Sequence, residues 1–133
     1  MITAGGGSPL AMRCIAGGAL LMLAAVILGA FGAHALQSML TPRQLASYAT
    51  GVTYQQLHAI GLILIGVIAR VTPPSPWLAR AAVLFGVGIV LFSGSIYAMT
   101  FGAPRWLGMV APIGGTSFML GWAAIAVHAL RQR

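Results

Sequence analysis

Four long runs of apolar residues, separated by short polar or proline-containing segments, set the pattern along the chain. They cover about residues 13–33, 49–69, 79–98 and 107–127. A membrane-spanning helix needs about 20 mostly apolar residues, because the hydrocarbon core of a bilayer is about 30 Å thick. Each run is long enough. The pattern therefore predicts an all-α polytopic membrane protein with four transmembrane helices.

A proline stands before or at the start of every run, in Ser8-Pro9, Thr41-Pro42, Ser75-Pro76 and Ala103-Pro104. Proline fits the first position of a helix, where its missing N–H is not needed, and a preceding Ser or Thr can cap the free amides. Thr41 and Gln44 also have the spacing of a capping box. We therefore predict helices that begin near residues 9, 42, 76 and 104, after a short N-terminal tail over residues 1–8.

The connections between consecutive spans are short, which forces neighbouring helices to run antiparallel and predicts one up-down bundle over residues 9–133. The two halves of the chain also share small motifs, since Pro42-Arg43 resembles Pro104-Arg105 and an arginine follows Pro9 and Pro76 at the same offset. Two tandem hairpins of like orientation would explain this likeness, and so would shared capping chemistry.

The first span has an alternative interpretation as a signal peptide. Arg13, the apolar run and Ala33-His34-Ala35 resemble a basic start, a hydrophobic region and a small-x-small cleavage site. The run is longer than the usual hydrophobic region of about 7–15 residues. We therefore expect an uncleaved first span.

Composition supports the membrane interpretation, because hydrophobic residues make up 59% of the chain and charged residues only 5%. A soluble domain carries about 25% charged residues. The seven formal charges are all arginines, scattered singly between apolar runs. Nucleic-acid binding needs a clustered basic face, so we expect the lipid bilayer as the partner and no nucleic acid.

The arginines also predict an orientation. The side that carries the N-terminus would hold Arg13, Arg70, Arg80, Arg131 and Arg133, and the opposite side only Arg43 and Arg105. Cytoplasmic loops are enriched in positive charge, so both termini are expected in the cytoplasm. Interfacial aromatic belts would then comprise Trp77 and Trp122 inside, and Tyr48, Tyr97 and Trp106 outside.

Polar residues of the spans gather in the half of the bilayer opposite the termini. Gly51, Gln55, His58 and Leu62 share one face of the second helix, and Tyr54 is one turn from His58. Polar groups in hydrocarbon must find partners or line a wet cavity, so a ligand pocket and an interhelical hydrogen-bond network are both open. The predicted polar cluster consists of His34, Thr53, Tyr54, Gln55, His58, Ser93, Tyr97 and Thr116.

Small residues four positions apart predict close contacts between helices, within the chain or between chains. Pro112 lies inside the fourth apolar run, and we expect it to kink the fourth helix and to free the carbonyl of Gly108. The predicted helix-packing residues are Ala25, Gly29, Ala33, Gly94, Ala98, Ser117 and Gly121.

The absence of Asp and Glu excludes several chemistries. Paired-carboxylate catalysis, an Asp-oriented Ser-His pair and carboxylate proton relays all lack their residues. A His34–His58 pair could ligate haem or a transition metal, but two ligands without a carboxylate or cysteine make a poor site. We therefore expect no enzyme, no metal and no cofactor, and keep a haem-binding redox module as a distant alternative.

Four segments of the chain stand out together: residues 29–36, the stretch around Gln55, Gln56, His58 and Ala59, residues 88–97, and Pro112–Gly115 with Gly121-Trp122. They resemble hallmarks of a family of small bacterial membrane proteins, domain-of-unknown-function family 423, the YgdD/YwdK type. The likeness covers roughly residues 10–130 and implies a four-helix inner-membrane protein without a known activity.

These observations favour a non-enzymatic accessory or assembly subunit. It would pack its glycine- and alanine-rich faces against further copies of itself or against a larger membrane complex. The alternative is a small-molecule binder or transporter that uses the polar cluster in the outer half of the bilayer. A four-helix transporter would need a dimer to provide alternating access.

Overall fold

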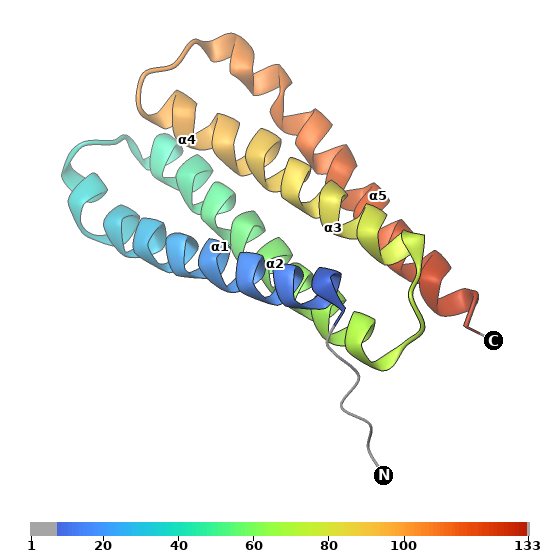
Figure 1. The fold of residues 1–133 in the computed structure, drawn as a ribbon. Coiled ribbons are helices and arrows are strands. Elements are labelled where there is room, and N and C mark those ends of the chain that lie inside the picture. Colours follow the sequence, from blue (N-terminus) through green and yellow to red (C-terminus); the bar gives the residue numbers. More distant parts are fainter. Residues whose placement is uncertain (1–7, 133) are drawn as a thin grey trace.

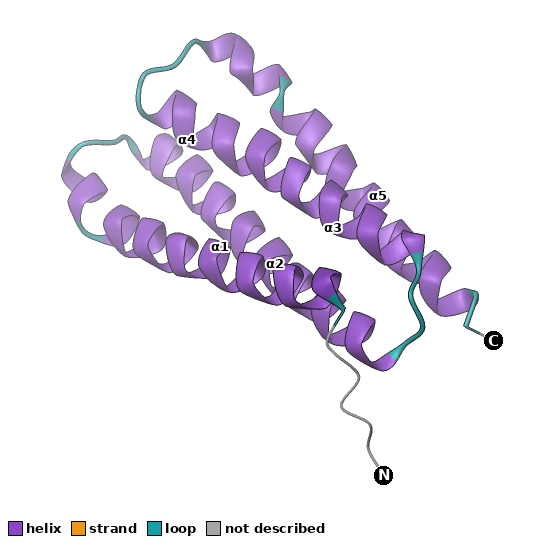
Figure 2. Ribbon diagram, viewed as in Figure 1, coloured by secondary structure: helices purple, strands orange, loops and turns teal. Residues whose placement is uncertain are grey.

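The computed structural model describes residues 8–132 and folds them almost entirely into helices (Figures 1 and 2). The prediction of a tail over residues 1–8 falls almost wholly outside these residues. The helices are α1 (Pro9–Ala33), α2 (Pro42–Val71), α3 (Pro76–Gly88), α4 (Gly94–Thr100) and α5 (Ala111–Leu130), with 3-10 helices η1 (Ala35–Ser38) and η3 (Arg105–Met109) and a π-helix η2 (Ile89–Ser93).

Four helical stretches are long and apolar enough to span a membrane, which confirms the predicted fold class. They are Pro9–Ser38, Pro42–Val71, Pro76–Thr100 and Arg105–Leu130. Their connections are short, so consecutive spans run antiparallel (Figure 1). The first and last described residues lie at the same end of the molecule as the α2–α3 connection (Figure 1).

Capping chemistry explains where two of the spans begin. The Thr41 N–H donates to Gln44 Oε1 at 2.9 Å, and the Gln44 N–H donates to Thr41 Oγ1 at 3.3 Å, which completes the predicted capping box. Ser75 Oγ accepts a hydrogen bond from the Trp77 N–H at 3.3 Å. Ser8 does not cap α1 through its side chain, and its carbonyl instead accepts from the Met12 N–H at 3.2 Å.

The four spans form two hairpins that lie side by side (Figure 1). In the first hairpin α1 packs along the length of α2, and in the second α5 packs along α3 and η2. The contact between the hairpins is made mainly by α2 against α3, η2 and α4. The middle two spans therefore join the hairpins, and α1 and α5 lie at the flanks.

Small residues bring α1 and α2 into backbone contact. Ala11, Gly18, Ala25 and Gly32 are all buried and recur every seventh residue, which is two turns of a helix at 3.5 residues per turn. A Cβ atom added at Gly18 would lie 2.6 Å from the carbonyl oxygen of Ala59. The two helices can approach this closely only because the α1 residues along the contact have no side chain or a single methyl group.

The predicted helix-packing set is only partly placed at close contacts. Ala25 and Ser117 are buried, and a Cβ at Gly121 would lie 2.5 Å from the Phe85 ring. Ala33 is exposed, and a Cβ at Gly94 would meet only the Ile89 carbonyl of the preceding π-helix, 3.9 Å away. These two residues therefore mark no close approach between helices in the described chain.

Two further members of the predicted helix-packing set also lie away from the closest contacts, and two glycines outside the set make them. A Cβ at Gly29 would only touch Val52 at 3.4 Å, and Ala98 is half-buried. The tightest glycine contacts of the second hairpin are instead made by Gly88, against Phe118, and by Gly114, against Phe92. Spacing within one helix could not identify these positions, because the partner ring on the facing helix decides them.

The fourth span differs from the predicted kinked helix. Residues 105–109 form the 3-10 helix η3, and α5 begins only at Ala111, so Pro112 lies in the first turn of α5. The expectation of a kink inside a continuous helix is wrong. A first-turn proline needs no N–H partner, and the Thr116 hydroxyl donates to the Pro112 carbonyl at 2.9 Å.

The predicted aromatic belt is wrong at Tyr48, which is only 2% exposed. Tyr97 is half-buried, and Trp122 is 42% exposed although its indole N–H donates a hydrogen bond to His58. Their polar atoms find partners on other helices, which replaces the water they would meet at an interface. Trp106 is 60% exposed, as an interfacial residue would be.

Candidate functional site

Gln55 joins three helices through one side chain. It is 4% exposed on the inner face of α2. Its Nε2 donates to the Leu21 carbonyl of α1 at 2.9 Å, and its Oε1 accepts from the Tyr97 hydroxyl of α4 at 2.7 Å. Because the amide is satisfied at both ends, Gln55 links the second hairpin to both helices of the first.

Ser93 makes a second link between the hairpins. It is fully buried at the end of the π-helix, and its hydroxyl donates to the Gly51 carbonyl of α2 at 2.7 Å. A π-helix carries one extra residue in the turn and frequently occurs at functional sites, where it changes the direction of the side chains that follow. Here the wide turn precedes α4, which carries Tyr97.

Tyr48 lies between α1 and α2 in the first hairpin, beside Tyr97 of the second. Its hydroxyl donates to the Leu28 carbonyl of α1 at 2.6 Å, and its ring centroid lies 5.5 Å from that of Tyr97. The Tyr48 ring lies over Gly32, where an added Cβ would be 2.5 Å from a ring carbon. We call Gln55, Tyr97, Ser93 and their carbonyl partners the polar seam, and Tyr48 borders it.

His58 uses both ring nitrogens within the protein. Its Nε2 lies 3.1 Å from the Trp122 Nε1, and its Nδ1 lies 2.7 Å from the Tyr54 carbonyl oxygen. An indole N–H can only donate, so Nε2 must be the acceptor and Nδ1 must carry the proton. The ring stacks on Phe118 with 3.5 Å between centroids and meets the edge of Phe85 at 5.1 Å. This geometry holds a neutral imidazole in one tautomer.

The proposed pairing of His34 with His58 is not formed. His34 is exposed at the C-terminal cap of α1, next to the α1–α2 connection. His58 lies sixteen residues after the start of α2, which is about 24 Å along the helix axis at 1.5 Å per residue. Across residues 8–132, no group of three or more His, Cys, Asp or Glu side chains is placed to hold a metal ion.

The remaining members of the predicted cluster lie outside the seam. Tyr54 is 39% exposed and packs its ring 4.6 Å from that of Phe92. Thr53 is exposed and faces a groove between α1 and α2, and Thr116 is exposed on α5. The structure thus brings Gln55, Ser93 and Tyr97 together, places His58 beside Trp122, and leaves His34, Thr53 and Thr116 apart.

Sequence reasoning missed three partners of this site. Trp122 is the donor to His58, and the carbonyls of Leu21 and Leu28 are the acceptors on α1. The carbonyls carry no sequence signal, because every residue has one. The indole does carry one, since the single N–H donor of a Trp within an apolar span needs an acceptor.

Two of the cavities along residues 8–132 have no lining side chain from the polar seam and do not include His58. The smaller one, of about 260 Å³, is the groove between α1 and α2 that includes Gly29, Gly32, Tyr48 and Thr53. The larger, of about 590 Å³, is a cleft between the start of α2 and the segment from α4 to η3. The side chains of the polar seam bond to one another and to backbone carbonyls of α1 and α2.

His128 forms a similar link at the opposite end of the molecule. It is 3% exposed in the last turn of α5, and its Nε2 lies 3.3 Å from the Thr72 hydroxyl oxygen. The Thr72 hydroxyl donates its own proton to the Ile68 carbonyl at 2.9 Å, so His128 Nε2 must be the donor. His128 therefore joins the end of the second hairpin to the end of α2.

Four apolar spans around a hydrogen-bonded interior define a multi-pass α-helical membrane protein. The chain belongs to the family described as Protein of unknown function (DUF423), whose model matches residues 28–115. The match runs from the end of α1 into α5 and includes every side chain of the polar seam. This confirms the family that the sequence resembles.

The chain is also similar to curated membrane proteins of unknown function. It is 39% identical over 114 residues to the UPF0382 membrane protein YwdK of Bacillus subtilis, covering 86% of this chain and 93% of the relative. It is 38% identical over 108 residues to the UPF0382 inner membrane protein YgdD of Escherichia coli, covering 81% and 82%. No solved structure gives a significant match. The expected bacterial membrane localisation agrees with these descriptions.

Proposed function

We propose that the protein is a non-enzymatic accessory or assembly subunit of the bacterial inner membrane, which binds other transmembrane helices through its lipid-facing surface. The observation that carries this proposal is that two buried polar side chains of α2, Gln55 and His58, are hydrogen-bonded within the protein. Gln55 is hydrogen-bonded at both ends of its amide, and His58 at both ring nitrogens. A catalytic or transport site instead needs groups that exchange partners during the cycle.

The lack of acidic residues supports the same proposal. The sequence holds no Asp or Glu, so no carboxylate can accept a proton, bind a coupling cation or orient a nucleophile. Such intramembrane carboxylates are common in proton and ion pathways. A small-molecule binder or transporter at the polar seam receives less support, because ligand entry would have to break the bonds that hold the hairpins together.

The free face of α1 is the surface best placed for a partner helix. In the most apolar window of the first span only 17% of residues are buried, against 44% in the second. Leu23 and Ile27 are more than half exposed on the side away from α2, and Ala16 and Ala30 flank them one or two turns away. Small residues beside large apolar ones let a second helix pack closely.

Site-specific photo-cross-linking in native membranes tests this proposal. We would place a benzophenone amino acid at Leu23 of the full chain and, as the matched control, at Val83, which is 65% exposed on α3. The expected result is a protein adduct of defined mass at position 23 and none at position 83. A second copy would give an adduct of twice the chain mass, and another subunit a different mass.

Native mass spectrometry of the protein extracted in mild detergent from its own membranes gives the independent measurement. The proposal expects a homo-oligomer or a complex with a defined partner. Monomers alone, together with no protein adduct at Leu23, would refute the proposal.

A further inference from the structure

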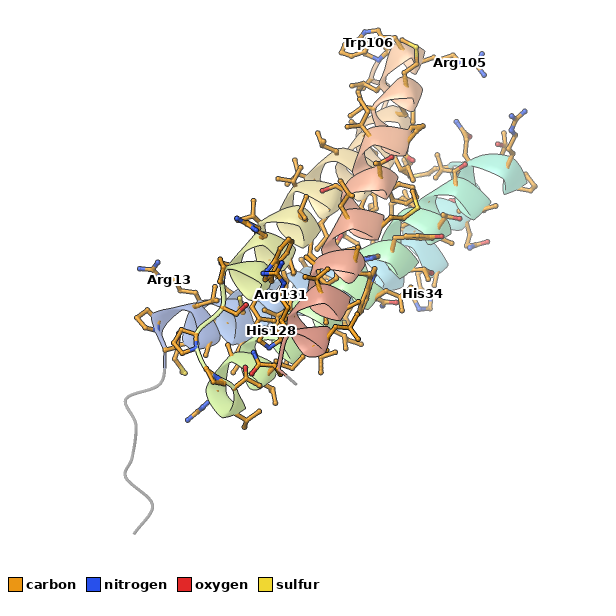
Figure 3. The ribbon with its side chains drawn as sticks, turned by 90° about the vertical axis from the view of Figure 1, so that its right-hand side faces the viewer. Arg13, His34, Arg105, Trp106, His128 and Arg131 are labelled. Carbon is orange, nitrogen blue, oxygen red and sulfur yellow. The ribbon has the colours of Figure 1, made fainter. Side chains whose placement is uncertain are left out.

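The cleft of about 590 Å³ lies where the two hairpins separate, at the end of the molecule opposite the described termini. One wall is the first part of α2, and the other is α4 with the start of η3. Figure 3 shows Arg105 extending from the tip of the second hairpin toward the side on which the first hairpin ends. The lining residues are Thr41, Arg43, Gln44, Ser47, Ile96, Met99, Thr100, Ala103 and Arg105.

Two guanidinium groups share this cleft without a carboxylate to neutralise them. Arg43 comes from the first turn of α2 and Arg105 from the first residue of η3. The chain contains no Asp or Glu, so no side chain of the protein can form a salt bridge with either group. Two like charges that face one cavity repel each other, and an anion between them removes this cost.

The other polar groups of the cleft are suited to the same ligand. The start of α2 carries the positive end of the helix dipole. Gln44 Oε1 already accepts from the N–H and the hydroxyl of Thr41, which leaves the amide NH2 of Gln44 as a donor. The hydroxyl of Ser47 adds a further donor to this wall. A guanidinium is a planar fork that binds two oxygens of one oxyanion.

The opposite wall is partly apolar. Ile96, Met99 and Ala103 line it beside the hydroxyl of Thr100. The cleft lies at the start of the second and fourth spans and the end of the third. The ends of membrane spans are where lipid headgroups meet water. Its volume is within the range of about 300–1,000 Å³ that is usual for small-molecule sites. The ligand would therefore combine an oxyanion with an apolar portion.

We propose that this cleft binds a phosphate group through Arg43 and Arg105, with the apolar part of the ligand against Ile96 and Met99. The phosphate belongs either to a phospholipid headgroup or to a soluble organic phosphate, since both offer the same oxyanion. This site is separate from the polar seam and from the free face of α1. Phosphate binding in the cleft does not depend on whether α1 binds a partner helix.

The test uses the purified full chain in a neutral maltoside detergent. In one arm, native mass spectrometry measures retention of phosphatidylglycerol against phosphatidylcholine. In the other arm, calorimetry measures binding of glycerol 3-phosphate and of inorganic phosphate. The variants are Arg43→Gln, Arg105→Gln and the double substitution, and the matched controls are Arg13→Gln and Arg70→Gln, which remove one charge each at the opposite end.

We expect each single cleft variant to bind about tenfold more weakly, which corresponds to one charge-assisted hydrogen bond of about 1.4 kcal/mol, and the double variant to bind about a hundredfold more weakly. Each control removes the same net charge as a cleft variant, but at the other end of the molecule. Binding by the controls should therefore stay within about twofold of the wild type, because salt screens a charge at that distance. Arg105→Lys keeps the charge but loses the fork, so it should fall between the wild type and Arg105→Gln. Circular dichroism and melting checks that every variant keeps its helices.

The arms separate the two sources of phosphate. Retention of phosphatidylglycerol alone assigns a lipid headgroup, and binding of glycerol 3-phosphate alone assigns a soluble ligand. Equal losses in cleft and control variants, or no binding of any of these probes by the wild type, would overturn the proposal.

Discussion

Gln55 is an expensive residue to place inside a transmembrane helix, and the structure shows how its cost is offset. An unpaired amide in hydrocarbon costs several kcal/mol. Both ends of the Gln55 amide are instead bonded, to the Leu21 carbonyl and to the Tyr97 hydroxyl. At the residue scale the energetic value of Gln55 is therefore the connection of three helices.

Replacing Gln55 by Leu should destabilise the fold by about 1–2 kcal/mol, because two interhelical hydrogen bonds are lost and the Tyr97 hydroxyl is left without its acceptor. Tyr97→Phe removes one of these bonds and should cost about 0.6 kcal/mol. Equilibrium unfolding in mixed maltoside and dodecyl sulfate micelles measures both. Gln56→Leu, on the next residue of α2, is the matched control, and an equal effect there would contradict the role of the seam.

At the element scale, two adjacent glycines of α1 have opposite surroundings, and one of them makes a close backbone contact in the first hairpin. A Cβ at Gly18 would lie 2.6 Å from the Ala59 carbonyl oxygen and 2.8 Å from a side-chain carbon of Ile63. A Cβ at Gly17 would meet nothing within 4 Å. One methyl group therefore distinguishes the packed face of α1 from its free side.

Gly18→Ala should lower the free energy of unfolding by about 1–3 kcal/mol, because α1 must move away from α2 to admit the methyl group. Gly17→Ala should leave stability unchanged or raise it by up to about 1 kcal/mol, since Ala is the better helix former. The same micelle unfolding assay compares them. If both substitutions had the same sign and size, the backbone contact would not limit packing.

The limits of sequence reasoning also lie at this scale. The helix starts at Pro9, Pro42 and Pro76 were predictable, because proline and its capping neighbours act locally. The π-helix over Ile89–Ser93 was not, since no local residue type requires the wide turn. Among the candidate residues, polar character in an apolar span was enough to select Gln55 and Tyr97.

The pairing of these residues was not predictable, for a physical reason. Membrane spans are apolar on nearly every side, so periodicity does not show which face of a helix turns inward. The inward turn of Tyr48 and Trp122 follows from the rotation of α2 and α5 about their axes. Both were assigned to the membrane surface on the basis of residue type alone.

At the scale of the whole molecule, charge is distributed unequally between the two ends. Arg13 and Arg131 lie at the end that carries the termini, and Arg105 lies at the other (Figure 3). Arg80 and Arg131 also approach the two-ring indole of Trp77, with guanidinium carbons 4.7 and 5.2 Å from the ring centre. Arg133, which the orientation prediction also used, lies outside the described residues. The excess of arginine favours the end with the termini as the cytoplasmic one.

This orientation predicts the behaviour of topology reporters. A green fluorescent protein fused after Arg133 should fluoresce, and alkaline phosphatase at the same site should be inactive, because that end stays in the cytoplasm. Alkaline phosphatase inserted at Gly102, between α4 and η3, should be active. The reverse pattern would invert the molecule and place the cleft of Arg43 and Arg105 in the cytoplasm.

The division into two hairpins also bears on how the protein is made. The ribosome completes α1 and α2 before Tyr97 has been synthesised, and the Leu21 carbonyl alone is then available to Gln55. A half-made or truncated chain therefore exposes one bare amide oxygen to lipid. We expect membrane quality-control proteases to recognise this unpaired oxygen and to degrade the truncated chain. In the complete chain the Tyr97 hydroxyl bonds to the oxygen, so this recognition is lost.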